Sequence, residues 1–174
     1  MKRVATIASL CAVLLLAACG FHPLYGSQGS HDGARRVFSS IYVDPIPGER
    51  IGYELRNSLI DNLQGTARPE AAAYHLKVSV DQYIQGIAVE NNAAVTRYNY
   101  TLNARYELSE ARSGKVLRSG LETTLSAYDV VASPYATQVA QEDAQKRGAQ
   151  DIAYRIQIAL AVYFAKHPTS VAAR

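Results

Sequence analysis

Two consecutive stretches of alternating apolar and polar residues constrain the fold more than any other feature of this sequence. In the first, Tyr74, Leu76 and Val78 alternate with polar residues, and the pattern continues towards Ala88. In the second, the apolar face consists of Tyr98, Tyr100, Leu102, Ala104, Tyr106 and Leu108. Strict alternation is typical of a strand with one buried face. We therefore expect two long strands, with a bulge near Gly86 and a turn at 90–92.

Two elements are expected before these strands. Residues 37–43, "VFSSIYV", are rich in β-formers and predict a first strand. From Glu49 to Gln64, apolar residues recur at the spacing of one helical stripe, with Gly65 as a natural stop. The stripe consists of Ile51, Leu55, Leu59 and Leu63.

A hairpin, a strand and a long helix are expected after them. Ser113-Gly114 marks the hairpin, and a fourth strand follows from Leu117 to about Val130. Serine before proline at Ser133-Pro134 is a strong helix start, and the helix can run to about Lys166. Its apolar stripe is small in the first half and bulky in the second: Ala140, Ala144, Gly148, Ile152, Ile156, Leu160 and Tyr163. The small half predicts either a close backbone approach near Gly148 or a kink there.

The element order βαβββα predicts an α+β fold, a two-layer sandwich. Two helices pack on one face of a four-stranded, mostly antiparallel sheet. We expect this single domain to span residues 35–168, with a C-terminal tail at 169–174. The other face of the sheet is expected to carry cations among Asn and Thr residues: Lys77, Arg97, Arg105 and Arg118.

The N-terminus has the pattern of a secretory signal peptide over residues 1–18. Lys2 and Arg3 precede an apolar run from Val4 to Ala18, which is shorter than the roughly 20 residues needed to span a bilayer. The run ends in Leu16-Ala17-Ala18-Cys19, which resembles the bacterial lipobox. We therefore expect cleavage before Cys19 and lipidation of its thiol, including an amide-linked acyl chain such as palmitate.

The expected lipidation has three consequences. Cys11 leaves with the signal peptide and lipid occupies Cys19, so the mature protein has no disulfide. Gly20, where Asp would favour retention in the inner membrane, is an outer-membrane address. Residues 19–34 form a lipidated N-terminus and a flexible linker, because the stretch from Gly26 is rich in Gly and Ser.

No constellation of catalytic or metal-binding residues is recognisable in the sequence. The four His residues are not at metal-ligand spacing, and Glu142, Asp143 and Asp151 are expected on a solvated helix face. The net charge of +3 falls to +1 once the two cations of the signal peptide are removed, which gives no reason to expect nucleic acid as a partner. We expect a binding or structural protein without a cofactor, and not an enzyme.

Two stretches resemble the LPS-assembly lipoprotein family LptE, in its alphaproteobacterial branch. They are "CGFHPLYG" after the lipobox and "ASPYATQVAQEDAQKRGAQDIAYRIQIAL" near the end. The resemblance implies a lipoprotein on the periplasmic side of the outer membrane. It would plug and help fold the β-barrel LptD and bind lipopolysaccharide during its insertion into the outer leaflet. Cys19 carries over as the lipid site, and Phe21, Pro23, Leu24 and Tyr25 are expected to pack against the barrel wall or the membrane interface.

Candidate contacts to lipopolysaccharide or to the barrel are the cations Arg97, Arg105, Lys115 and Arg118; ordinary solvated strand charges are the alternative. Three rival functions remain open. They are a lipoprotein scaffold for a different barrel or envelope complex, a lipid-anchored envelope enzyme, and a solute-binding lipoprotein. The last usually needs a larger, two-lobed chain than the 156 residues left when 18 are removed from 174.

The lipobox assignment makes a direct prediction. Replacement Cys19→Ala removes the nucleophile that accepts the lipid, so the protein should remain uncleaved or become soluble. Metabolic labelling with a fatty acid measures this. Label that persists in the Cys19→Ala protein would refute the assignment.

Overall fold

A four-stranded sheet with helices beside it forms the part of the chain that the computed structural model describes, residues 30–64, 72–89 and 95–167. Contacts divide the chain after Asp32, and the description below concerns the unit that begins at Gly33. The elements follow in the order α2 (Ser30–Ser39), β1 (Ile41–Val43), α3 (Glu49–Leu63), β2 (Tyr74–Val89), β3 (Val95–Glu110), β4 (Val116–Asp129) and α4 (Pro134–Lys166).

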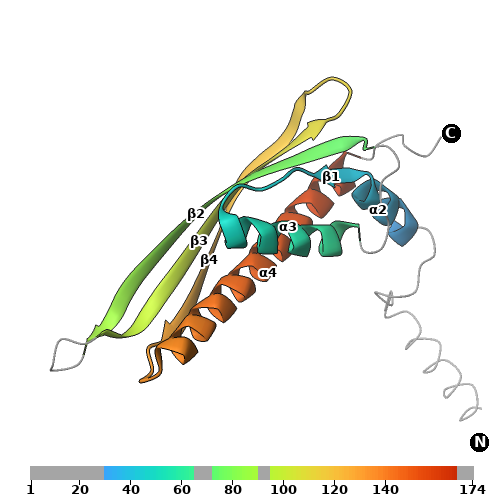
Figure 1. Cartoon of the computed structure of the whole chain (residues 1–174). Coiled ribbons are helices and arrows are strands. Elements are labelled where there is room, and N and C mark those ends of the chain that lie inside the picture. The colour runs from blue at the N-terminus through green and yellow to red at the C-terminus, as the bar shows by residue number, and fades with distance from the viewer. Residues whose placement is uncertain (1–29, 65–71, 90–94, 168–174) are drawn as a thin grey trace, which may run out of the picture. The chain divides into compact units, whose positions relative to one another are not determined.

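The sheet has the strand order β1-β2-β3-β4. Strands β2, β3 and β4 form an antiparallel meander, whereas β1 pairs with β2 in parallel. Helices α3 and α4 lie on one face of this sheet (Figure 1). The α+β fold expected from the sequence is thus confirmed.

The expected strand over residues 37–43 is wrong in its first half. Helix α2 continues to Ser39, and β1 covers only Ile41–Val43. Phe38 packs its ring edge-on against Phe164 of α4, with 6.4 Å between the centroids. Tertiary packing therefore overrides the local preference for β structure. Because α2 begins at Ser30, the last residues of the stretch expected to be a linker are helical, and the rest of that stretch lies outside the described residues.

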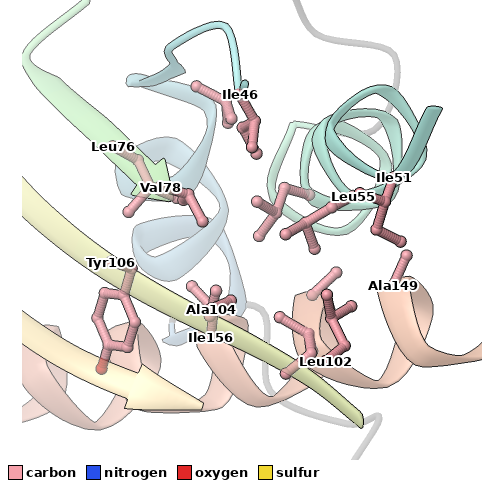
Figure 2. Packing of buried hydrophobic residues seen from close by; sticks show 14 of the residues in the cluster. Ile46, Ile51, Leu55, Leu76, Val78, Leu102, Ala104, Tyr106, Ala149 and Ile156 are labelled. Atoms are coloured by element: carbon pink, nitrogen blue, oxygen red, sulfur yellow. The ribbon is translucent and has the colours of Figure 1, made fainter. Parts of the chain in front are cut away.

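The helical layer consists of α3 and α4, which run side by side in the same direction. Near their beginnings Arg50 forms an ion pair with Glu142 at 2.7 Å, and farther along Gln157 Nε2 donates to the Asn62 carbonyl at 2.8 Å. The predicted stripe of α3 is buried in full. Figure 2 shows side chains of α3, α4 and the sheet pointing into this shared core.

Helix α4 starts and ends where the sequence predicts. The Ser133 hydroxyl accepts a hydrogen bond from the Ala136 amide at 3.4 Å, Pro134 is the first helical residue, and the helix runs unbroken to Lys166. Ala144, Gly148, Ile152, Ile156 and Leu160 are buried as the stripe predicts. A Cβ at Gly148 would lie 3.4 Å from Thr124 Cγ2 and 3.4 Å from Tyr100 Cε1, so the helix approaches β3 and β4 closely here.

The hairpin features are confirmed where the structure describes them. The register of β2 and β3 shifts between Gly86 and Ala88, at the expected bulge, and Gly114 has φ of +69° in the β3–β4 hairpin. The expected stop at Gly65 and turn at 90–92 lie outside the described residues. No helix within the described ranges is both long and apolar enough to cross a membrane.

The close approach at Gly148 predicts opposite effects for two substitutions. Gly148→Leu should cost about 1–3 kcal/mol through overpacking, which thermal unfolding would show as a lower Tm. Gly148→Ala adds one methyl group at ordinary contact distance and should be neutral or stabilising, by up to about 1 kcal/mol of helix propensity. An unchanged Tm in Gly148→Leu would contradict the observed packing.

Burial of Tyr100 predicts a loss of stability at high pH. Burial raises the pKa of Tyr100 from 10.0 to about 12, so between these values the unfolded state holds fewer protons than the native state. The contribution of Tyr100 to the free energy of unfolding is present in full below pH 10 and is lost as the pH rises towards 12. Urea unfolding measures the free energy of unfolding at about pH 9 and about pH 11. This free energy should fall less between the two pH values for Tyr100→Phe than for the native protein.

Part of that fall should remain in Tyr100→Phe. The pKa of Tyr128 is also raised, by burial and by the neighbouring Tyr98 phenol. Equal falls in the native and Tyr100→Phe proteins would show that Tyr100 ionises as an ordinary tyrosine.

Candidate functional site

The sheet face opposite α3 and α4, called here the outer sheet face, carries three of the four cations predicted for it. Strand register places Lys77, Arg97 and Arg105 there. Arg97 forms an ion pair with Asp129 at 3.1 Å, and Lys77 lies directly opposite Glu107. The outer sheet face is therefore polar and of mixed sign, with most of its charge balanced.

Arg105 differs from its neighbours on this face. Its cross-strand partners are Ser79 and Leu121, and no described carboxylate pairs with it. The same face also exposes the apolar side chains of Leu121 and Leu125, at 56% and 62%. The outer sheet face thus offers both hydrogen-bonding and apolar contact area along β4.

The prediction that Arg118 lies on the outer sheet face is wrong. The register of β3 and β4 runs without a shift from the pair Tyr98–Tyr128 to the pair Leu108–Arg118. Arg118 therefore lies in the row of the buried Leu108 and Tyr128, on the helix side of the sheet. The leucines of β4 suggest the opposite alternation, but Leu121 and Leu125 are exposed on the outer sheet face.

Arg118 and Lys115 instead line a common hollow, called here the basic pocket. Its volume is about 450 Å³, and its lining consists of Lys115, Val116, Leu117, Arg118, Tyr163 and His167. The Tyr163 and His167 rings are stacked with 4.5 Å between centroids, and His167 Nδ1 lies 3.0 Å from the Tyr163 carbonyl. Two fixed cations and no carboxylate line the pocket, so it suits an anionic group such as a phosphate.

The sequence does not indicate that Tyr163 and His167 belong to a candidate binding site. Tyr163 falls in the apolar stripe predicted for the last helix, and His167 directly follows the predicted helix end at about Lys166. Their spacing of four residues on one helix was the available signal, because such residues share a face. Their meeting with β4 depends on tertiary structure, which no local pattern reports.

No catalytic or metal centre is visible in the described part of the chain. No group of three or more His, Cys, Asp or Glu residues there could hold a metal ion. Asp151 accepts hydrogen bonds from the buried Thr124 hydroxyl at 2.7 Å and from Arg155 at 3.0 Å, and Ser133 serves as a helix cap. Cys19 and the stretch from Phe21 to Tyr25 lie outside the described residues.

Known structures share this fold. A candidate lipoprotein from Caulobacter crescentus CB15 is 30% identical, with a TM-score of 0.67 over 78% of this chain and 97% of that chain. Rare lipoprotein B from Shewanella oneidensis is 13% identical, with a TM-score of 0.56 over 74% of this chain and 98% of that chain, and supports the fold alone. No curated protein sequence matches.

A family model described as "LptE: Lipopolysaccharide-assembly" matches residues 38–160. The matched region begins in α2 and ends in the last part of α4, so it includes the whole sheet. It spans more than half of the 174 residues, and the chain therefore belongs to the LptE lipopolysaccharide-assembly family.

Proposed function

We propose that this protein is a lipid-anchored outer-membrane component of the lipopolysaccharide translocon. It plugs the LptD β-barrel, assists assembly of that barrel, and binds lipopolysaccharide during insertion into the outer leaflet. Membership of the LptE family, over residues 38–160, is the observation that carries the proposal. The proposal includes a signal peptide at 1–18, acylated Cys19 with its linker to residue 34, the domain at 35–168 and a tail at 169–174.

The outer sheet face supports the barrel part of the proposal. The interior wall of a transmembrane barrel is polar. The outer sheet face presents ion-paired Arg97 and Asp129, the hydrogen-bonded pair Thr123 and Asn103, and the unpaired cation Arg105. Such a surface can form hydrogen bonds with a polar wall. Its ion-paired charges stay compensated when the wall buries them.

The basic pocket supports the lipopolysaccharide part. A phosphorylated headgroup is bound best by more than one cation, and both Lys115 and Arg118 line one hollow. The guanidinium of Arg118 can bind phosphate through two parallel hydrogen bonds, while the Lys115 ammonium acts as a point charge. Arg97 and Arg105 lie on the other face of the sheet, so they cannot share this headgroup with the pocket.

The proposed role requires the protein to bind partners but not to carry out a covalent reaction itself. The LptE family is a non-enzymatic component of lipopolysaccharide assembly and does not depend on a cofactor. The buried Thr124 hydroxyl donates to Asp151, which also accepts from Arg155, so these polar side chains have a structural role. The proposed role thus depends on surfaces and charges alone.

The first test is a pull-down of the tagged full-length protein from detergent-solubilised outer membranes, with partners identified by mass. We expect a large β-barrel in stoichiometric amount, together with lipopolysaccharide. A different barrel would favour the alternative function, a scaffold for another envelope complex. Recovery of the lipoprotein alone would contradict the plug function.

The second test separates the two cationic surfaces. The double variant Lys115→Glu/Arg118→Glu should bind purified lipopolysaccharide at least about tenfold more weakly, since 1.4 kcal/mol is a tenfold change and charged hydrogen bonds exceed that. Arg105→Glu is the matched control, an exposed charge reversal on the outer sheet face, and should leave this affinity unchanged. Loss of affinity in Arg105→Glu with retention in the double variant would move the lipopolysaccharide contact to the outer sheet face.

A further inference from the structure

The second half of α4 exposes an apolar stripe that nothing in the described chain covers. Tyr154, Ile158 and Val162 follow at intervals of four residues and are 57%, 45% and 48% exposed. Ala161 and Ala165, which are also exposed, lie on the same side of the helix. We call these five residues the α4 apolar stripe. A contiguous apolar patch of this kind marks an interaction site more often than scattered single residues do.

The α4 apolar stripe is not part of the core. The core residues of this half of the helix are Ile152, Ile156 and Leu160, which are fully buried on the opposite side. Helix α3 ends beside the Asn62–Gln157 contact, so it does not extend over the later stripe residues. The first half of α4 carries Asp143, Arg147 and Gln150 on the stripe's side of the helix, and a single helix thus changes from a polar to an apolar outer face.

Cations surround this end of the domain. Arg155 and Lys166 flank the α4 apolar stripe, and α2 contributes exposed Arg35 and Arg36 within three residues of Phe38, which contacts Phe164 of α4. Among the described residues, Arg155 is paired with Asp151, whereas no carboxylate pairs with Arg36 or Lys166. An apolar helix face with a cationic rim is typical of helices that lie on anionic lipid surfaces.

Chain length restricts what this end of the domain can reach. The described chain begins at Ser30, eleven residues after Cys19. Eleven residues span at most about 40 Å even when fully extended. If Cys19 is acylated, Ser30 stays within that distance of the leaflet that holds the lipid, and Phe38, which contacts the end of α4, lies only about 12 Å farther along the helix.

We propose that the α4 apolar stripe docks on the lipid leaflet in which the acylated Cys19 is anchored. The inference rests on the lipid anchor of the proposed function and deepens it. The helix lies along the membrane surface, with the apolar side chains below the headgroups, the Tyr154 hydroxyl among them and the basic residues on anionic lipid. The outer sheet face stays free in this docked state, because that face lies on the other side of the sheet from α4 (Figure 1). The docked state is the one we propose for the protein before a barrel encloses it.

The test uses the acylated full-length protein in vesicles of phosphatidylethanolamine and phosphatidylglycerol, without a barrel. Cys11 is removed with the signal peptide and Cys19 carries lipid, so an introduced cysteine is the only free thiol. Ile158→Cys probes the stripe, and Val162→Cys is a second position should the first disturb folding. Leu125→Cys is the matched control, an exposed aliphatic residue on the outer sheet face. Each thiol is labelled with a fluorophore, and nitroxide-bearing lipids serve as the quencher.

We expect several-fold stronger quenching at positions 158 and 162 than at 125, and a decrease when phosphatidylglycerol is replaced by neutral lipid. Equal quenching at all three positions would overturn the docking proposal. Thiol cross-linking between two copies at position 158, without quenching, would overturn it in favour of a dimer. Vesicle flotation separates this failure from that of the proposed function. A protein that does not float lacks the anchor, whereas one that floats without quenching at 158 is anchored but undocked.

Discussion

The packing of α4 against β3 and β4 is the contact on which the rest of the structure depends. Helix α3 packs against α4 and β1 and does not replace α4 beneath the last two strands. Small side chains at Ala144 and Gly148 allow the close approach, and the Thr124–Asp151 hydrogen bond fixes the position of the helix along the sheet. A shift of α4 would leave the buried Thr124 hydroxyl without a partner, which is costly. The position of Tyr163 and His167, and hence of the basic pocket, follows from this contact.

Much of this arrangement could be predicted from the sequence, because the relevant patterns are local. The alternation around Tyr100 and the Ser133-Pro134 helix start report burial and capping, which act over a few residues. Two errors show where local reasoning fails. The β-forming stretch at residues 37–43 is partly helical because Phe38 meets the distant Phe164. Arg118 lies on the helix side because β4 presents Leu121 and Leu125 to the outer sheet face, although apolar residues favour the core.

The candidate site was less predictable than the fold for the same reason. Lys115 was recognised from its hairpin, but its closeness to Arg118, Tyr163 and His167 arises only when β4 and α4 come together. The outer sheet face and the basic pocket thus lie on different sides of one sheet. A protein built this way can present separate surfaces to a protein wall and to an anionic ligand, and neither contact needs to displace the other.

The parallel pairing of β1 has a consequence for the order in which the domain assembles. Strands β2, β3 and β4 are neighbours in both sequence and space, whereas Ile41 meets Tyr74 only after α3 has crossed between them. Closing a longer loop costs more entropy, and this favours a meander that forms first and a first strand that joins later. In this order of assembly, the residues nearest the proposed anchor enter the sheet last. A chain already tethered at its N-terminus can form most of its structure before the tethered end is fixed in place.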